Sequence, residues 1–182
     1  MRGAESRKNY SVTKKIAIVG IAAATVECGK LALAFLPNIE VVSILLALYG
    51  FVFGYVGVTA AAVFVCIEPL IWGFGSWMVT YFVYWPALAL VFCFLGKVRL
   101  GSRWVVTGIA IGMTLLFGII SSIIDALFLF GVTKHFFQNL LLYYARGIVF
   151  YAIQTACNAV LFFTLFEFLS KKLGIIKRRM SL

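Results

Sequence analysis

The residues of this chain that could do chemistry are few, and most of them stand inside long apolar stretches. Glu27 and Lys30 are three positions apart, so on a helix they share a face and can pair. Ser121 and Asp125 share a face in the same way, and Glu68 stands alone in a third apolar stretch. An ionisable group at bilayer depth costs about 2.5–3.5 kcal/mol by insertion scales, so each of these groups needs a partner or a ligand.

A second group of polar residues lies near the C-terminus at helical spacing. It comprises Tyr143, Arg146, Phe150, Gln154, Cys157 and Asn158. Pairing of Arg146 with Asp125 or Glu68 is one interpretation of these buried polar groups. Convergence on a single cavity is the other, and we expect it for the set as a whole.

Aromatic residues are concentrated between positions 72 and 85. Seven of these fourteen residues are aromatic: Trp72, Phe74, Trp77, Tyr81, Phe82, Tyr84 and Trp85. Lipid-facing rings at a membrane interface are the usual explanation of such a cluster. Residues 77, 81, 84 and 85 share one stripe, however. This arrangement favours a mobile aromatic lid that covers a cavity for an organic ligand.

The sequence contains no motif of a known catalytic mechanism. HExxH, GxSxG and phosphate-loop patterns are all missing, so we expect no enzyme and no catalytic residue. His135, the only histidine, falls with Lys134, Gln138 and Asn139 in an expected loop, where it is either solvated or in contact with a ligand. The four cysteines have scattered spacings inside apolar segments, so we expect neither a metal site nor a cofactor.

The composition and the positions of the charged residues indicate that these residues are held by membrane helices. Hydrophobic residues make up 64% of the chain and charged residues 12%, against about 25% charged residues in soluble domains. Thirteen of the sixteen Lys and Arg fall in three patches. The patches are Arg2, Arg7, Lys8, Lys14 and Lys15; Lys97, Arg99 and Arg103; and Lys171, Lys172, Lys177, Arg178 and Arg179. Cytoplasmic loops collect such residues, so both termini and the middle loop should be cytoplasmic, and the charge of +10 does not indicate nucleic-acid binding.

We therefore predict an all-α integral membrane protein, a bundle of six transmembrane helices. The expected helices cover residues 15–36 (ended by Pro37), 40–55, 57–72, 77–95, 104–131 and 144–170. Residues 1–14 form a basic cytoplasmic segment, 15–171 the membrane domain and 172–182 a basic cytoplasmic tail. The turns at 37–39 and 73–76 and a loop at 132–143 then face outside.

Small residues form two stripes that would let helices approach closely. Gly20 and Ala24 lie four residues apart in the first helix, and Gly108 and Gly112 do the same in the fifth. Packing inside the bundle is one interpretation, and a docking face for another membrane protein is the other.

Several segments resemble the S-component, the substrate-binding membrane subunit, of energy-coupling-factor (ECF) vitamin transporters. They are Lys14-Lys15-Ile16-Ala17, the Gly20/Ala24 stripe, Leu36-Pro37-Asn38-Ile39-Glu40 and Trp72-Gly73-Phe74-Gly75. The resemblance implies a multi-pass protein of the cell membrane that captures a vitamin outside and topples against a transmembrane T-component. Two cytoplasmic ATPase subunits would hydrolyse the ATP of this ABC-type importer. The family docks through an Ala-xxx-Ala motif, in which Gly20 here replaces the first alanine and Ala24 is the second.

The ligand that the resemblance favours is cobalamin, because the Tyr49-Gly50-Phe51 and Trp72-Gly73-Phe74-Gly75 segments look most like cobalamin-associated S-components. Riboflavin, folate, pantothenate or a precursor is the alternative ligand. A stand-alone carrier, or an intramembrane enzyme in which Glu27, Glu68 and Asp125 converge, is the alternative class. The expected ligand-binding residues are Asn38, Glu68, Trp72, Phe74, Trp77, Tyr81, Tyr84, Trp85, Asp125, His135, Asn139, Tyr143 and Arg146.

Overall fold

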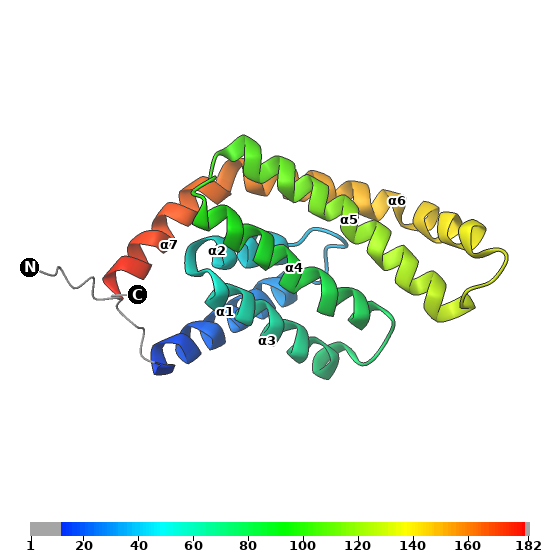
Figure 1. Cartoon of the computed structure of the whole chain (residues 1–182), viewed down its shortest axis with the longest axis horizontal. Helices are drawn as coiled ribbons and strands as arrows, with labels where there is room; N and C mark the ends of the chain where they lie inside the picture. The colour runs from blue at the N-terminus through cyan, green and yellow to red at the C-terminus, as the bar shows by residue number, and fades with distance from the viewer. Residues whose placement is uncertain (1–11, 181–182) are drawn as a thin grey trace, which may run out of the picture.

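The computed structural model describes residues 12–180, and within that range the chain forms helices and no strand (Figure 1). The first five helices are α1 (Val12–Ala32), α2 (Val42–Phe53), α3 (Tyr55–Trp72), α4 (Trp77–Lys97) and α5 (Arg103–Phe130). The sixth is continuous and consists of α6 (Phe136–Leu161), the π turn η1 (Phe162–Phe166) and α7 (Glu167–Arg179). The predicted all-α class is confirmed.

Four of these helices are long and apolar enough to cross a membrane: α3, α4, α5 and the continuous helix Phe136–Arg179. The short helix α2 has 12 residues and is about 18 Å long at 1.5 Å per residue, below the ~30 Å of a bilayer core. Helix α1 is long enough but carries Lys14, Lys15, Glu27 and Lys30. The structure thus has four candidate spans of an integral membrane protein, and crossing by α1 and α2 stays a prediction.

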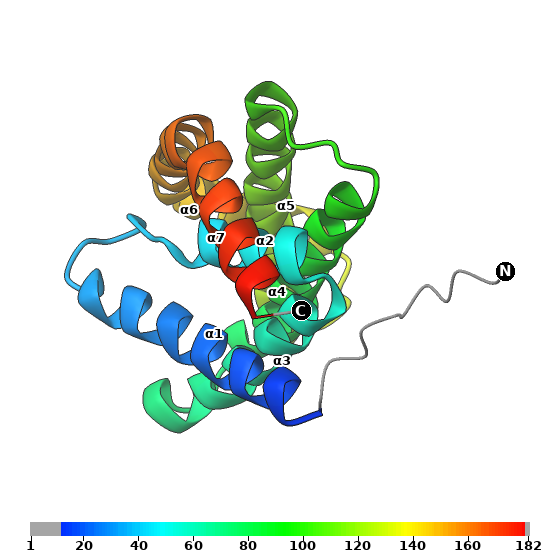
Figure 2. The same ribbon diagram turned by 90° about the vertical axis from the view of Figure 1, so that its left-hand side faces the viewer.

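The helices are arranged around α2 and α4, which lie in the middle of the bundle (Figures 1 and 2). Helices α5 and α6 run antiparallel along one side, and α1 and α3 pack against each other on the other side. The axis of α7 bends away from that of α6, and α7 packs along α2. Buried apolar side chains of α2, α3, α4 and η1 form the core between these layers.

Lysine and arginine residues gather at one end of this bundle, which we call the basic end. There the Lys14 ammonium donates to the Met180 carbonyl at 3.2 Å and Lys177 to the Val52 carbonyl at 2.5 Å. Lys97 donates to the Tyr55 hydroxyl at 2.9 Å. The middle and C-terminal basic patches therefore share an end with the start of α1, as the predicted topology requires. Arg2, Arg7 and Lys8 of the first patch lie outside the described residues.

Glycine permits a close backbone contact between α2 and α4. A Cβ added at Gly50 would stand 2.2 Å from the Ala89 carbonyl oxygen, and one at Gly96 would stand 2.2 Å from the Phe51 carbonyl oxygen. Gly54, with a φ of 66°, makes the sharp reversal between α2 and α3, a conformation that glycine adopts without steric strain. These backbone contacts hold α2 deep in the bundle, where it supports the segment that precedes it.

Three predicted helix boundaries are wrong. Helix α1 ends at Ala32, four residues before the predicted end at 36, and residues 33–41 form turns and a loop. Helix α6 begins at Phe136, so most of the loop expected at 132–143 is helical, because residues 136–143 contain no glycine or proline to interrupt a helix. The same helix continues past 170 to Arg179, and Leu169 and Leu173 pack against the core. Residues 172–179 of the expected basic tail are therefore helical.

Candidate ligand-binding site

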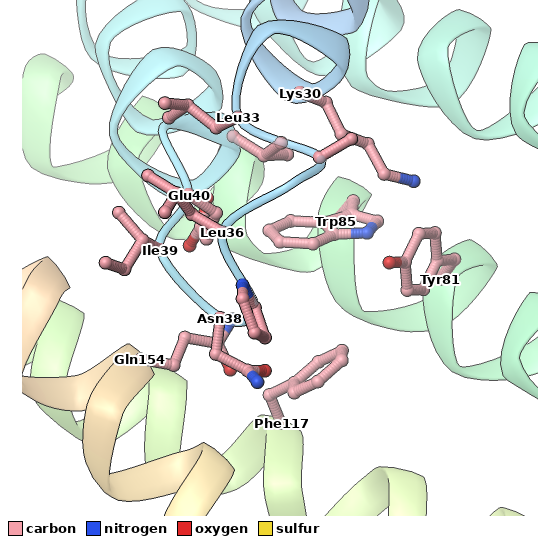
Figure 3. A pocket seen from close by; sticks show the side chains of 13 residues that line it. Lys30, Leu33, Leu36, Asn38, Ile39, Glu40, Tyr81, Trp85, Phe117 and Gln154 are labelled. Atoms are coloured by element: carbon pink, nitrogen blue, oxygen red, sulfur yellow. The ribbon is translucent and has the colours of Figure 1, made fainter.

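A cavity of about 220 Å³ lies under the α1–α2 loop, residues 33–41, at the end of the bundle opposite the basic end (Figure 3). Helices α4, α5 and α6 contribute one wall each, and the end of α1 together with the loop supplies the rest. Its lining residues are Lys30, Leu33, Ala34, Leu36, Pro37, Asn38, Ile39, Glu40, Val42, Tyr81, Trp85, Phe117 and Gln154.

The α1–α2 loop owes its shape to residues within it. Asn38 has a φ of 61°, a left-handed conformation that asparagine tolerates better than most residues. Glu40 then caps the start of α2: its Oε2 accepts the Ser43 N–H at 2.8 Å and its Oε1 accepts the Ser43 hydroxyl at 2.5 Å. An acidic side chain at this position satisfies an amide that the helix itself leaves unpaired.

A buried asparagine ties this loop to the far side of the bundle. The Asn158 side chain on α6 is fully buried, and its Nδ2 donates to Glu40 Oε1 at 3.2 Å and to Thr114 Oγ1 on α5 at 3.0 Å. Hydrogen bonds to a charged acceptor in a buried setting contribute about 1.5–3 kcal/mol each. The cover of the cavity is therefore fixed to α2, α5 and α6 at once.

Aromatic rings form the wall of the cavity on the α4 and α5 side. Trp85 lies edge-on to Tyr81, with ring centroids 5.5 Å apart, and 6.0 Å from Phe117. Trp85 is only 3% exposed, and its indole N–H has no acceptor among the described residues. A buried donor without an acceptor costs about 1–3 kcal/mol, so a ligand with an acceptor group at this point would relieve that cost.

The two charged residues that line the cavity both have partners. The Lys30 ammonium pairs with the Glu68 carboxylate of α3, and it lies 5.2 Å from the ring centroids of Trp72 and Tyr81. Glu40 is held by Ser43 and Asn158, as described above. The amides of Asn38 and Gln154 lie beside Phe117 (Figure 3). The cavity thus offers aromatic faces and amide groups.

Only part of the predicted ligand-binding set meets at this cavity. Asn38, Tyr81 and Trp85 line it, while Glu68 and Trp72 contact Lys30 at its edge. Trp77 stacks on Tyr81 with centroids 5.1 Å apart, and Tyr84 is buried against Phe117 at 4.8 Å. The interface-belt interpretation does not hold for Tyr84 and Trp85, which are buried. These rings belong to a packed wall, and the α1–α2 loop supplies the cover that was expected from residues 72–76.

The remaining predicted residues lie elsewhere. Asp125 accepts the Ser76 hydroxyl at 2.6 Å, Phe74 is 82% exposed, and His135 contacts Gln138 at 2.9 Å. Asn139 and Tyr143 belong to α6 rather than to the expected loop, and Arg146 lies in the same helix, as predicted. The Arg146 guanidinium lies over the Tyr143 ring, 5.8 Å from its centroid. The suggested pairing of Arg146 with Asp125 or Glu68 is not found, since those carboxylates bind Ser76 and Lys30.

Sequence reasoning missed two residues of the cavity wall. Gln154 stood in the polar stripe of the sixth helix but was not selected as a ligand contact. Phe117 carried no signal, because one phenylalanine among 18 in an apolar chain looks like any other. From its spacing along one helix, Lys30 was predicted to pair with Glu27, whereas in the structure it forms an ion pair with Glu68 of α3.

The three carboxyl groups considered for an intramembrane enzyme do not all meet in the structure. Within residues 12–180, no group of three or more His, Cys, Asp and Glu side chains is placed to hold a metal ion. Glu27 and Glu68 do approach each other, but Asp125 is held by Ser76 and does not join them.

Comparison of the chain with protein-family models, with curated proteins and with solved structures found no match in any of the three. The functional argument therefore rests on the geometry of the cavity and on the sequence.

Proposed function

We propose that this protein is the ligand-capturing membrane subunit of an ATP-driven, ECF-type vitamin importer, and that the ligand binds in the cavity under the α1–α2 loop. The observation that carries the proposal is this cavity under the α1–α2 loop, with an aromatic wall of Tyr81, Trp85 and Phe117 and with the amides of Asn38 and Gln154 in its lining. Ligand pockets combine apolar and aromatic walls with a few placed polar groups in this way.

The size and charge of the cavity support a ligand smaller than cobalamin. A volume of about 220 Å³ falls below the ~300–1,000 Å³ of pockets for drug-sized molecules, and a corrinoid is larger than those. Because both charged lining residues are already paired, a neutral ligand is favoured over folate or pantothenate. We therefore place a small neutral vitamin precursor first and riboflavin ahead of cobalamin, because a larger ligand requires a larger displacement of residues 33–41.

The small-residue stripe of α1 supports a membrane partner. Gly20 and Ala24 are exposed, and a Cβ at Gly20 would meet no heavy atom within 4 Å in the described part of the chain. The stripe therefore packs against no helix of residues 12–180, which supports the docking interpretation over packing inside the bundle. We propose that a T-component occupies this face, with two ATPase subunits below it. The basic end would then face the cytoplasm, as the excess of Lys and Arg there predicts.

Titration of the purified protein with a vitamin panel tests the proposal. The panel contains riboflavin, cobalamin, folate and pantothenate, and bound ligand is also identified by mass spectrometry of the protein as purified. Submicromolar binding of one vitamin supports a capture subunit, and riboflavin binding supports the size argument. Binding of none by a folded protein, together with solute flux in liposomes that lack partner subunits, would favour a stand-alone carrier instead.

A further inference from the structure

A cluster of three ionisable side chains lies between α1 and α3, at the edge of the cavity. It consists of Glu27 and Lys30 on α1 and Glu68 on α3, and we call it the Glu27–Lys30–Glu68 cluster. Glu68 is fully buried and Glu27 is 7% exposed. Lys30 belongs both to this cluster and to the cavity lining.

Most of the carboxyl oxygens in the cluster have no donor. Glu68 Oε2 accepts Lys30, but Glu68 Oε1 and both oxygens of Glu27 are buried without a hydrogen-bond partner among the described residues. The two carboxyl groups nevertheless lie close enough to interact with each other. Two ionised carboxylates can only accept hydrogen bonds, so nothing in residues 12–180 donates to these unpartnered oxygens.

The charges of the cluster do not balance if every group is ionised. Two carboxylates and one ammonium leave one negative charge in a site shielded from water, and an unpaired buried charge is strongly unfavourable. The neighbouring titratable groups on other elements are the Tyr81 phenol of α4 and Glu40 of the loop. Neither of these adds a positive charge, so the imbalance persists.

We propose that the Glu27–Lys30–Glu68 cluster is a proton-binding site, in which one proton is shared between the two carboxyl groups. The proton neutralises the excess charge and turns one oxygen into the O–H donor that the pair lacks. A metal ion fits less well, because oxygen-bound cations take six or more ligands and the Lys30 ammonium already occupies Glu68 Oε2. This site does not depend on the identity of the transported ligand.

Thermal unfolding of the purified protein as a function of pH tests the proposal. The native cluster binds a proton that ionised glutamates of the unfolded chain do not bind, so stability should fall as pH rises from acidic to mildly alkaline values. Glu27→Gln supplies an amide donor and removes the titration, so this variant should melt higher than the wild type at alkaline pH and show a flatter pH profile. Asp125→Asn, the same carboxyl-to-amide change at a site away from the cluster and the cavity, is the control and should keep the wild-type pH profile.

Infrared spectroscopy of the wild-type protein provides a measurement that does not depend on the folding of a variant. We expect a carbonyl band of a protonated carboxylic acid at neutral pH, which disappears on alkaline titration. Loss of that band in Glu27→Gln would assign it to the cluster. A wild-type spectrum without the band, or an unfolding profile that Glu27→Gln leaves unchanged, would overturn the proposal. A stability gain with sodium over choline at fixed ionic strength, abolished in Glu27→Gln, would instead identify a metal-ion site.

Discussion

Trp85 combines two properties at the level of a single residue: its ring forms part of the cavity wall, and its N–H is buried without an acceptor. We predict that Trp85→Phe, which keeps an aromatic ring but removes the N–H, weakens binding of the vitamin found in the panel by about three- to tenfold. That loss corresponds to one hydrogen bond of about 0.5–1.5 kcal/mol. Isothermal titration calorimetry measures it.

Trp77→Phe is the matched control, because Trp77 stacks on Tyr81 but does not line the cavity. The affinity of Trp77→Phe for the same vitamin should stay within twofold of the wild-type affinity. Equal losses in the two variants would mean that the aromatic segment acts as a whole and that the Trp85 N–H has no special role.

Lys30 shows what sequence spacing can and cannot predict about a residue. A separation of three positions placed Glu27 and Lys30 on one helical face, and both do lie in the same cluster. The partner of Lys30 is nevertheless Glu68, which is 38 residues away in sequence. Pairing between helices depends on how α1 and α3 pack, and no local pattern encodes that contact.

At the level of the helices, the contact of α2 with α4 depends on Gly50. We predict that Gly50→Ala lowers the free energy of unfolding by about 1–3 kcal/mol, the usual range for overpacking, because its Cβ would meet the Ala89 carbonyl oxygen at 2.2 Å. Gly20→Ala, where the added methyl group meets open space, should be neutral or stabilising by up to about 1 kcal/mol from helix propensity. Thermal unfolding of both variants in the same detergent checks this pair. A Gly50→Ala protein as stable as Gly20→Ala would contradict the close packing.

Apolar length predicted the existence of the helices well, since the 3.6-residue repeat and long apolar runs are local signals. The predicted ranges 57–72 and 77–95 lie close to α3 and α4. Two of the three boundary errors arose where the polarity changed within a helix. Residues 136–143 include Gln138 and Asn139 and were taken for a loop, and the basic residues after 170 were taken for a tail. Polarity marks the depth of a residue in the membrane, whereas helix continuity requires only the absence of breakers.

The cavity was predictable only in part for a related reason. Tyr81, Trp85 and Asn38 were found because aromatic clusters and a Pro-Asn turn are visible in sequence. The cover was misassigned to residues 72–76, since the sequence does not show that Asn158 of α6 holds Glu40 and thereby closes the α1–α2 loop. Such a contact joins residues 118 positions apart and follows only from the assembled bundle.

At the level of the whole molecule, the basic end and the cavity end should lie on opposite sides of the membrane. We predict that the cysteine of the Lys172→Cys variant is labelled by an impermeant maleimide only after the cells are permeabilised. The cysteine of the His135→Cys variant should be labelled in intact cells. The four natural cysteines are first replaced by alanine in both variants. The physical reason is the concentration of Lys and Arg at the basic end. The reverse labelling pattern would invert the topology and place the cavity inside the cell.

The exposed face of α1 gives a prediction about assembly. Gly20→Leu should abolish co-purification with a T-component, because close approach of two helices requires small residues at the contact. Ligand binding should be unchanged, since Gly20 does not line the cavity. Gly108→Leu on α5, also exposed with open space around it, is the control. Loss of the complex with Gly108→Leu alone would move the docking face to α5.

The π turn at Phe162–Phe166 limits the insertions and deletions that this protein can accept. A π turn holds one residue more than an α-helical turn, and each helical residue rotates the chain by about 100°. Asn158 before the turn and Lys177 after it both make fixed contacts, to Glu40 and to the Val52 carbonyl. Deletion of one residue in the turn would give a regular α-helix and keep Asn158 and Lys177 on their present faces, because the wider π turn absorbs the rotation of its extra residue. Insertion of a further residue would instead rotate Lys177 by about 100° away from Val52. Homologous chains should therefore differ in length here only by loss of that one residue, and other insertions or deletions should be confined to the loops.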